Sequence, residues 1–97
     1  MADHRAIRVT IDHVHNRHVC NPTTVEVDPG DTVAWVGDEA FFVLFTDESP
    51  FEEGQGIFTQ SQRGTIKSGF PHRKKFTPRF KVGDVFLMDT EGSVIIR

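Results

Sequence analysis

Residues 24–36 read TVEVDPGDTVAWV, two short β runs joined by a turn, and they are the most informative part of the chain for predicting its fold. In the second run Val33 and Trp35 alternate with smaller or polar residues, which is typical of a strand with one buried face. Between the runs, Pro29 presets φ for the first central position of a tight turn and Gly30 supplies a positive φ at the second. The stretch therefore predicts a strand, a tight turn and a core strand.

Other segments show the same two-residue period or an apolar run of strand length. The chain has nine Phe, one Trp and no Tyr, a mixture that with its many Val and Ile favours strands, and no segment predicts a helix of ten residues. Together these features predict an all-β chain, an antiparallel Greek-key β-sandwich of seven or eight strands in one domain spanning 1–97. The expected strands lie at 6–12, 24–27, 32–36, 41–45, 74–81, 85–88 and 93–97, and residues 57–58 and 65–66 are the candidates for one further short strand.

Bulk composition is that of a globular protein, with 37% hydrophobic and 26% charged residues. One cysteine, Cys20, excludes an internal disulfide framework and fits a reducing compartment. No stretch is long and apolar enough to span a bilayer, and the opening residues carry no signal-peptide hydrophobic region. We expect a cytoplasmic location for the chain as given, with a periplasmic or extracellular one open if the natural chain begins earlier.

Charge is unevenly distributed along the chain, although the net charge is only −3. Residues 1–60 contain eleven acidic and three basic side chains, whereas residues 61–97 contain three acidic and eight basic ones. If the halves interleave in a sandwich, these charges complement each other internally. If they do not, they form a bipolar surface that recognises a charged partner or another copy of the chain.

Two parts of the sequence resemble the cupredoxins. Residues 21–36 are similar to their N-terminal signature, in which a Pro and a short β run lead through a Gly-Asp turn into Thr-Val-x-Trp-Val. Residues 80–86, followed by 92–96, are similar to their closing hairpin. The resemblance implies a cupredoxin-like Greek-key sandwich, and it bears on fold rather than on activity.

The resemblance also implies where a blue-copper site would lie, which needs two His, one Cys thiolate and usually an axial Met. The first His would follow the Trp-Val strand, but residues 37–43 contain none. The remaining ligands would lie between the last two strands, where only the short loop 89–92 remains, and no Cys or His follows His72. Met88, in an apolar run, is expected to pack at the core or its rim. We therefore predict a member without the type 1 copper ligands and without a cofactor.

A different metal site is the first alternative. His13, His15, His18 and Cys20 lie within eight residues, and thiolate with imidazole suits copper or zinc. On an extended segment the first two imidazoles would share a face. The spacing matches no standard zinc signature, and Arg17 adds a positive charge, so a polar edge strand and loop with a small buried Cys20 competes with this reading.

Nucleic-acid binding through the basic segment 72–81 is the second alternative. Its cations are interleaved with Phe76 and Phe80. Surfaces that bind single-stranded nucleic acid combine cations, which contact phosphates, with aromatic rings, on which bases stack. The pI near 5.9 and the core-like alternation of the two Phe argue instead for a solvated basic strand, so nucleic acid is an unlikely partner.

The run 41–45 holds more aromatic side chains than one strand buries on a single face. Either the long middle loop covers them, or they form an exposed surface for a protein partner or for self-association. The residues of this expected partner surface are Phe41, Phe42, Phe45 and Phe51.

Catalysis has no support in the sequence. The acidic residues of 47–53 are not accompanied by a nucleophile–base pair or a phosphate-binding Gly loop. We therefore expect a copper-free, cupredoxin-like binding or interaction module with a structural or sensory role, without a redox centre and not an enzyme.

Overall fold

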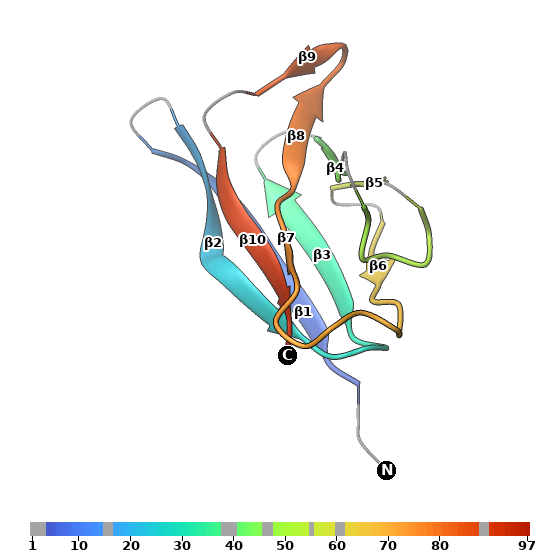
Figure 1. Ribbon diagram of the computed structural model, residues 1–97. Helices are drawn as coiled ribbons and strands as arrows, with labels where there is room; N and C mark the ends of the chain where they lie inside the picture. The colour runs from blue at the N-terminus through green and yellow to red at the C-terminus, as the bar shows by residue number, and fades with distance from the viewer. Residues whose placement is uncertain are drawn as a thin grey trace.

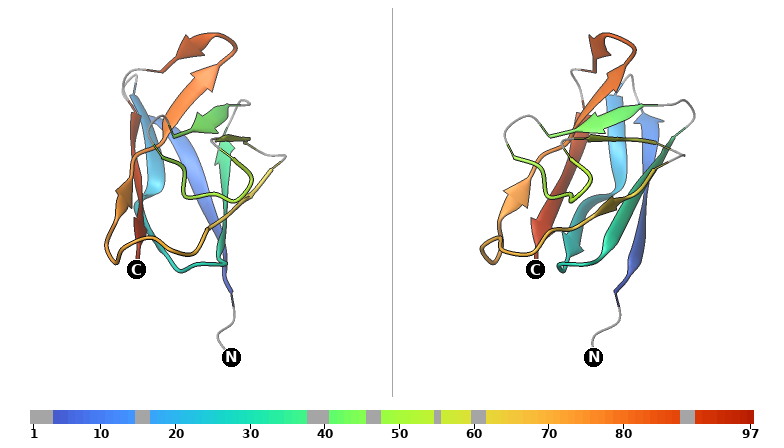
Figure 2. Two further views of the ribbon diagram at one scale, coloured as in Figure 1. Left: turned by 45° about the vertical axis from the view of Figure 1, so that its right-hand side comes forward. Right: turned by 90° about the vertical axis from the view of Figure 1, so that its right-hand side faces the viewer.

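The computed structural model describes residues 4–14, 17–37, 41–45, 48–54, 56–59, 62–87 and 90–97. These residues form ten strands and no helix, arranged as two facing sheets (Figures 1 and 2). The strands are β1 (Ala6–Val14), β2 (Arg17–Val27), β3 (Thr32–Gly37), β4 (Phe42–Leu44), β5 (Gly56–Phe58), β6 (Gly64–Thr65), β7 (Lys75–Phe76), β8 (Arg79–Val82), β9 (Val85–Phe86) and β10 (Thr90–Ile96). The larger sheet has the order β6-β3-β1-β2-β10-β7 and the smaller one β5-β4-β8-β9. The described residues contain no helix that could cross a membrane.

The prediction of an all-β sandwich is confirmed, but two details of it were wrong. The described part of the chain has ten strands rather than seven or eight, because β5 and β6 both form and residues 74–81 divide into β7 in the larger sheet and β8 in the smaller one. The larger sheet is also mixed rather than purely antiparallel, since β1 runs parallel to β3 and β2 runs parallel to β10.

The N-terminal strands are longer than the sequence predicts. The sequence predicts strands at 6–12 and 24–27, with no strand between them. Instead β1 and β2 pair antiparallel up to Val14 and Arg17, and the cis peptide Asn21–Pro22 lies inside β2. The neighbouring strands β1 and β10 supply backbone hydrogen bonds to β2. These long-range partners extend a strand where the local pattern does not indicate one.

The predicted turn between β2 and β3 is confirmed. Gly30 has a φ of 92°, and the backbone N–H of Asp31 donates to the carbonyl of Asp28 over 3.1 Å. The buried carboxylate of Asp31 accepts hydrogen bonds from the backbone N–H groups of Arg5 (2.8 Å) and Asp28 (2.9 Å), and from the Arg5 guanidinium (3.0 Å). This one side chain therefore ties the start of β1 to the β2–β3 turn.

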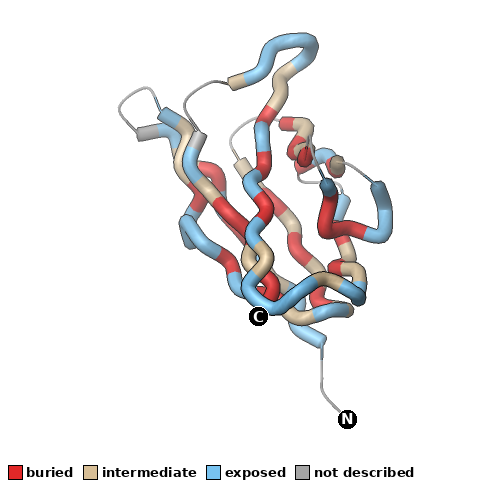
Figure 3. The backbone as a smooth tube through the Cα atoms, in the orientation of Figure 1, coloured by how far each residue is buried: buried red, intermediate tan, exposed pale blue. Residues whose placement is uncertain are grey.

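The core lies between the sheets, and every strand except β6 and β9 contributes buried hydrophobic side chains to it (Figure 3). Its centre is an aromatic cluster in which Trp35, Phe45 and Phe51 meet edge to face, with ring centroids 5.3 to 6.3 Å apart. Edge-to-face packing places the positive edge of one ring against the negative face of the next.

Candidate interaction surface on the four-stranded sheet

The smaller sheet has one buried and one exposed face. Cross-strand register places Ile57 beside Val43 and Val43 beside Phe80, and all three side chains are buried against the larger sheet. Because successive side chains of a strand point to opposite faces, the neighbouring positions must point outward.

The outward positions line up as a second row, which we call the outer row: Phe58, Phe42, Lys81 and Phe86. Each is the direct cross-strand partner of the next. Phe58 is 51% exposed and Phe86 is 36% exposed, whereas Phe42 and Lys81 are half-buried. Exposed aromatic side chains on one continuous sheet face are unusual for a surface that contacts only water.

Two cations lie against one aromatic ring of the outer row, that of Phe86. The guanidinium of Arg79 lies 4.7 Å from the centroid of Phe86, and the Nζ of Lys81 lies 5.6 Å from it. Such cation–π contacts hold both charges on the apolar surface. Neither cation forms an ion pair within the described residues. The outer row is thus both aromatic and positively charged.

One end of the outer row lies on a hairpin that projects from the sandwich. β8 and β9 extend beyond the other strands at one end of the molecule (Figure 1). Val85, in β9, is 65% exposed. The sequence predicts residues 85–88 as a core strand, which is wrong for Val85 and Phe86, because the larger sheet does not cover this hairpin.

The other end of the outer row depends on a glycine. A Cβ on Gly56 would lie 2.6 Å from the Cζ of Phe42, so only glycine lets this ring settle over β5. There the ring packs against Phe58, with centroids 4.8 Å apart.

The partner surface expected from the sequence is corrected by the structure. Of its four residues only Phe42 belongs to the exposed face, whereas Phe41, Phe45 and Phe51 are buried. Phe45 and Phe51 complete the aromatic cluster around Trp35, and the backbone N–H of Phe41 donates to Thr59 Oγ1 over 2.8 Å. The middle segment covers these rings, which is the first of the two arrangements that the sequence left open.

The His/Cys cluster is only partly brought together. His13 and His18 are cross-strand partners whose rings stack with centroids 4.6 Å apart and an interplanar angle of 5°. Cys20 pairs instead with Ile11 and is buried in the core. His15 lies outside the described residues.

The stacked rings of His13 and His18 are not arranged to bind one metal ion together. Imidazole lone pairs lie in the ring plane, so one ion must lie close to the planes of both rings that bind it. Two stacked, nearly parallel rings have no such common point. Within the described residues no three His, Cys, Asp or Glu side chains are grouped to hold a metal.

In the segments where the resemblance places blue-copper ligands, the described residues supply no copper-binding side chain of the blue-copper type. Beyond β3 the first described residue is Phe41, whose ring centroid lies 5.6 Å from that of His18 and 6.1 Å from that of Phe80. A phenyl ring has no lone pair to donate to a metal. At the start of β10 the described positions are Thr90, Glu91 and Gly92, which provide neither thiolate nor imidazole. Met88 lies outside the described residues.

Burial also makes Cys20 a poor nucleophile. Desolvation by burial raises the pKa of its thiol to about 11. A hydrogen bond with Trp35 partly offsets this rise, and the negative charge of Asp12 adds a smaller increase. Only the thiolate reacts. We therefore expect the folded protein at pH 8 to react with 5,5′-dithiobis(2-nitrobenzoate) at least about 100-fold more slowly than the protein in guanidinium chloride. Equal rates would show an accessible thiol and return Cys20 to the candidate metal ligands.

The basic segment 72–81 does not provide the stacking platforms expected of a nucleic-acid surface. Phe76 and Phe80 are buried in the core. Two of its cations are paired, Arg73 with Glu26 at 2.5 Å and Lys74 with Glu48 at 2.9 Å. Only the outward residues of β8 contribute to an exposed aromatic surface. The cross-strand row that they form was missed in the sequence, because its members come from four separate strands.

The fold is a cupredoxin-like β-sandwich. Among solved structures the chain is similar to a pseudoazurin from Sinorhizobium meliltoi, with a TM-score of 0.58 and 15% sequence identity, over 96% of this chain and 74% of that chain. At this identity the likeness shows the fold alone. No protein-family model and no curated protein sequence matches the chain.

Proposed function

We propose that this chain is a copper-free cupredoxin-like module that binds a protein partner through the outer row and catalyses no reaction. The observation that carries the proposal is the continuous alignment of Phe58, Phe42, Lys81 and Phe86 on the exposed face. Aromatic side chains and arginine are enriched among the residues that dominate protein–protein binding energy. Arg79, stacked on Phe86, adds to this set.

The charge of the outer row specifies the partner. Lys81 and Arg79 have no described carboxylate paired with them, so a surface carrying Asp or Glu beside apolar side chains complements them. A second copy docked face to face would set like charges against each other. For nucleic acid, two such cations would give few phosphate contacts on a chain of net charge −3. An acidic, partly apolar protein surface therefore fits best.

The test is an NMR titration of the isotope-labelled protein with a short peptide of alternating Glu and Phe. We expect saturable shifts confined to the outer row, and none with a peptide in which Lys replaces Glu. Phe86→Ala or Lys81→Gln should each weaken binding by about fivefold or more. Lys75→Gln, which removes a positive charge from the larger sheet, is the matched control and should change little.

Three outcomes would contradict this proposal. Shifts centred on the larger sheet would move the binding site elsewhere. Tighter binding of a single-stranded oligonucleotide, with steep salt dependence, would favour the nucleic-acid alternative. Concentration-dependent dimerisation in sedimentation velocity, abolished by Phe86→Ala, would favour self-association.

The absence of a redox centre is tested separately, by anaerobic titration with Cu(I), Cu(II) and Zn(II) followed by native mass spectrometry. We expect no stoichiometric complex and no intense blue absorption with copper. A one-to-one complex that is lost in His13→Ala or His15→Ala would establish the metal-binding alternative, and a blue absorption would overturn the proposal that the chain lacks a redox centre.

A further inference from the structure

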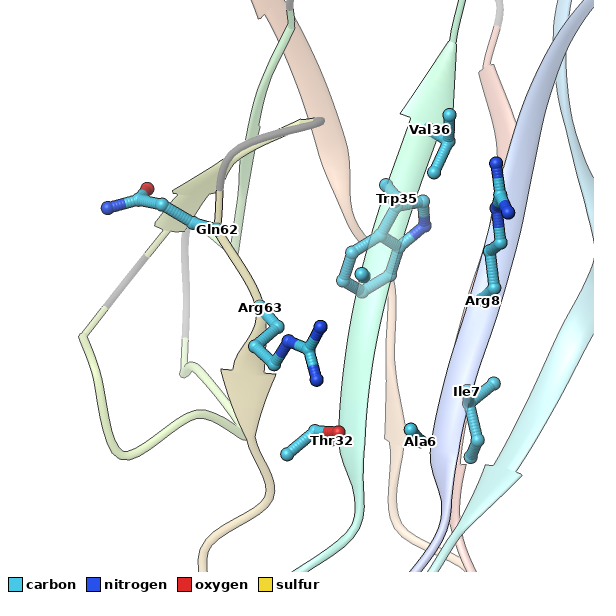
Figure 4. Close-up of a pocket in the computed structure, with 9 residues that line it drawn as sticks. Ala6, Ile7, Arg8, Thr32, Trp35, Val36, Gln62 and Arg63 are labelled. Atoms are coloured by element: carbon cyan, nitrogen blue, oxygen red, sulfur yellow. The ribbon is translucent and has the colours of Figure 1, made fainter.

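A cavity of about 330 Å³ opens on the outer face of the larger sheet, between β1, β3 and the segment that leads into β6 (Figure 4). The residues that decide its chemistry are Arg8 on one side, Arg63 on the other, and Ala34 and Thr32 between them. This volume is at the lower end of the range of small-molecule sites.

Strand register places the two arginines on either side of a small residue. Arg8 on β1 is the direct cross-strand partner of Ala34 on β3. On the other side of β3, Val33 is the partner of Gly64 in an antiparallel pair, so the next position along places Arg63 beside Ala34. Neighbouring strands are about 4.8 Å apart, so the two arginine Cα atoms are separated by about 10 Å. Figure 4 shows the guanidinium of Arg63 extending toward β3, and Arg8 on β1 lies on the other side of β3.

These two arginines differ from the other five in the chain. Four of the others pair with carboxylates, and Arg79 covers Phe86. Within the described residues Arg8 and Arg63 have no ion pair and no side-chain hydrogen bond, and no carboxylate lines the cavity. The nearby Glu53 is engaged, accepting hydrogen bonds from the backbone N–H (2.6 Å) and the hydroxyl (2.8 Å) of Thr65.

We propose that this cavity binds a phosphate monoester, held between Arg8 and Arg63 above Ala34. Two guanidinium groups that line one cavity suit a dianion, and a phosphate monoester carries close to two negative charges near neutral pH. Each guanidinium can donate two parallel hydrogen bonds to phosphate oxygens, and the Thr32 hydroxyl adds a donor at the same edge. The alanine between them leaves room for the phosphate.

The test is an NMR titration with phenyl phosphate, with inorganic phosphate and acetate as comparisons, all at one ionic strength set with chloride. We expect saturable shifts of the Arg8 and Arg63 side-chain N–H signals and of the Ala34 amide, with phenyl phosphate bound more tightly than acetate. Arg8→Gln or Arg63→Gln should weaken binding by about tenfold or more, as loss of a charge-assisted contact does. Arg17→Gln, which removes a positive charge from β2 outside the cavity, is the matched control and should bind as the unmodified protein does.

A second variant separates shape from charge. Ala34→Leu keeps both arginines but fills the space between them, so binding should be lost while circular dichroism and the melting temperature show a folded protein. If Ala34→Leu does not fold, the two arginine variants decide. Shifts that do not saturate, that appear equally with chloride, or that survive Arg63→Gln would overturn the proposal. A serine phosphopeptide that binds more tightly than phenyl phosphate would identify a phosphorylated protein, rather than a small molecule, as the source of the group.

Discussion

Replacing Phe45 with Ala should destabilise the folded protein by about 3–5 kcal/mol, the usual loss for a buried Phe, which combines lost burial with the cavity left behind. Phe45 is buried and contacts Trp35, Phe51 and Phe76 edge to face, so its removal opens the aromatic cluster from three sides. A domain of this size is stable by only about 5–15 kcal/mol. The variant should therefore be much closer to unfolding at room temperature.

The measurement is urea unfolding followed by Trp35 fluorescence, with Phe58→Ala as the matched control. Phe58 is half exposed, so its removal should change the free energy of unfolding by no more than about 1 kcal/mol. If the two variants lost equal stability, Phe45 would not occupy the core position that the structure assigns to it. Its earlier assignment to an exposed partner surface would then have to be restored.

Asp31→Ala should also be strongly destabilising, by about 3 kcal/mol, because it removes hydrogen bonds to a charged acceptor and leaves buried donors unpaired. The lost bonds are those to the backbone N–H groups of Arg5 and Asp28 and to the Arg5 guanidinium. The start of β1 should then separate from the β2–β3 turn. Hydrogen exchange should show faster exchange at the Arg5 and Asp28 amides, with the smaller sheet less affected.

The same carboxylate makes stability depend on pH. Burial acts to raise the pKa of Asp31, but the hydrogen bonds from Arg5 and Asp28 and the charge of Arg5 outweigh it, so the pKa lies below the ordinary value of 3.8. The unfolded chain therefore binds more protons in the acidic range, and stability falls as pH falls. The contribution is complete above pH 3.8 and is lost as pH decreases through the folded-state pKa.

Asp31→Asn tests this sign directly. It keeps one acceptor oxygen but no titrating group, so its free energy of unfolding should be lower at pH 7 and should fall less steeply between pH 5 and pH 2. Glu53, whose pKa is also lowered because its hydrogen bonds with Thr65 outweigh burial, preserves part of the slope. A variant with the full slope of the unmodified protein would show that Asp31 is not the group responsible.

Parts of the candidate site were visible in the sequence, and others were not. The alternation around Phe80 predicts that Arg79 and Lys81 point away from the core, as they do. Nothing local places Phe58 and Phe86 in line with them, because that row depends on the registers of three separate strand pairs. The same limit applies to the cavity, where Arg8 and Arg63 are brought together only by the pairing of β1 and β6 with β3.

What the sequence determined by itself was the kind of structure and its best-patterned strands. Period-two alternation and the Asp28–Asp31 turn depend only on neighbours in the chain, so the burial of Val33 and Trp35 was predictable. Only the tertiary structure decided which aromatic rings are covered and which strands lie side by side. Register and the docking of one sheet on the other depend on contacts between distant residues, and a shift of one residue in the register of a strand would exchange its buried and exposed faces.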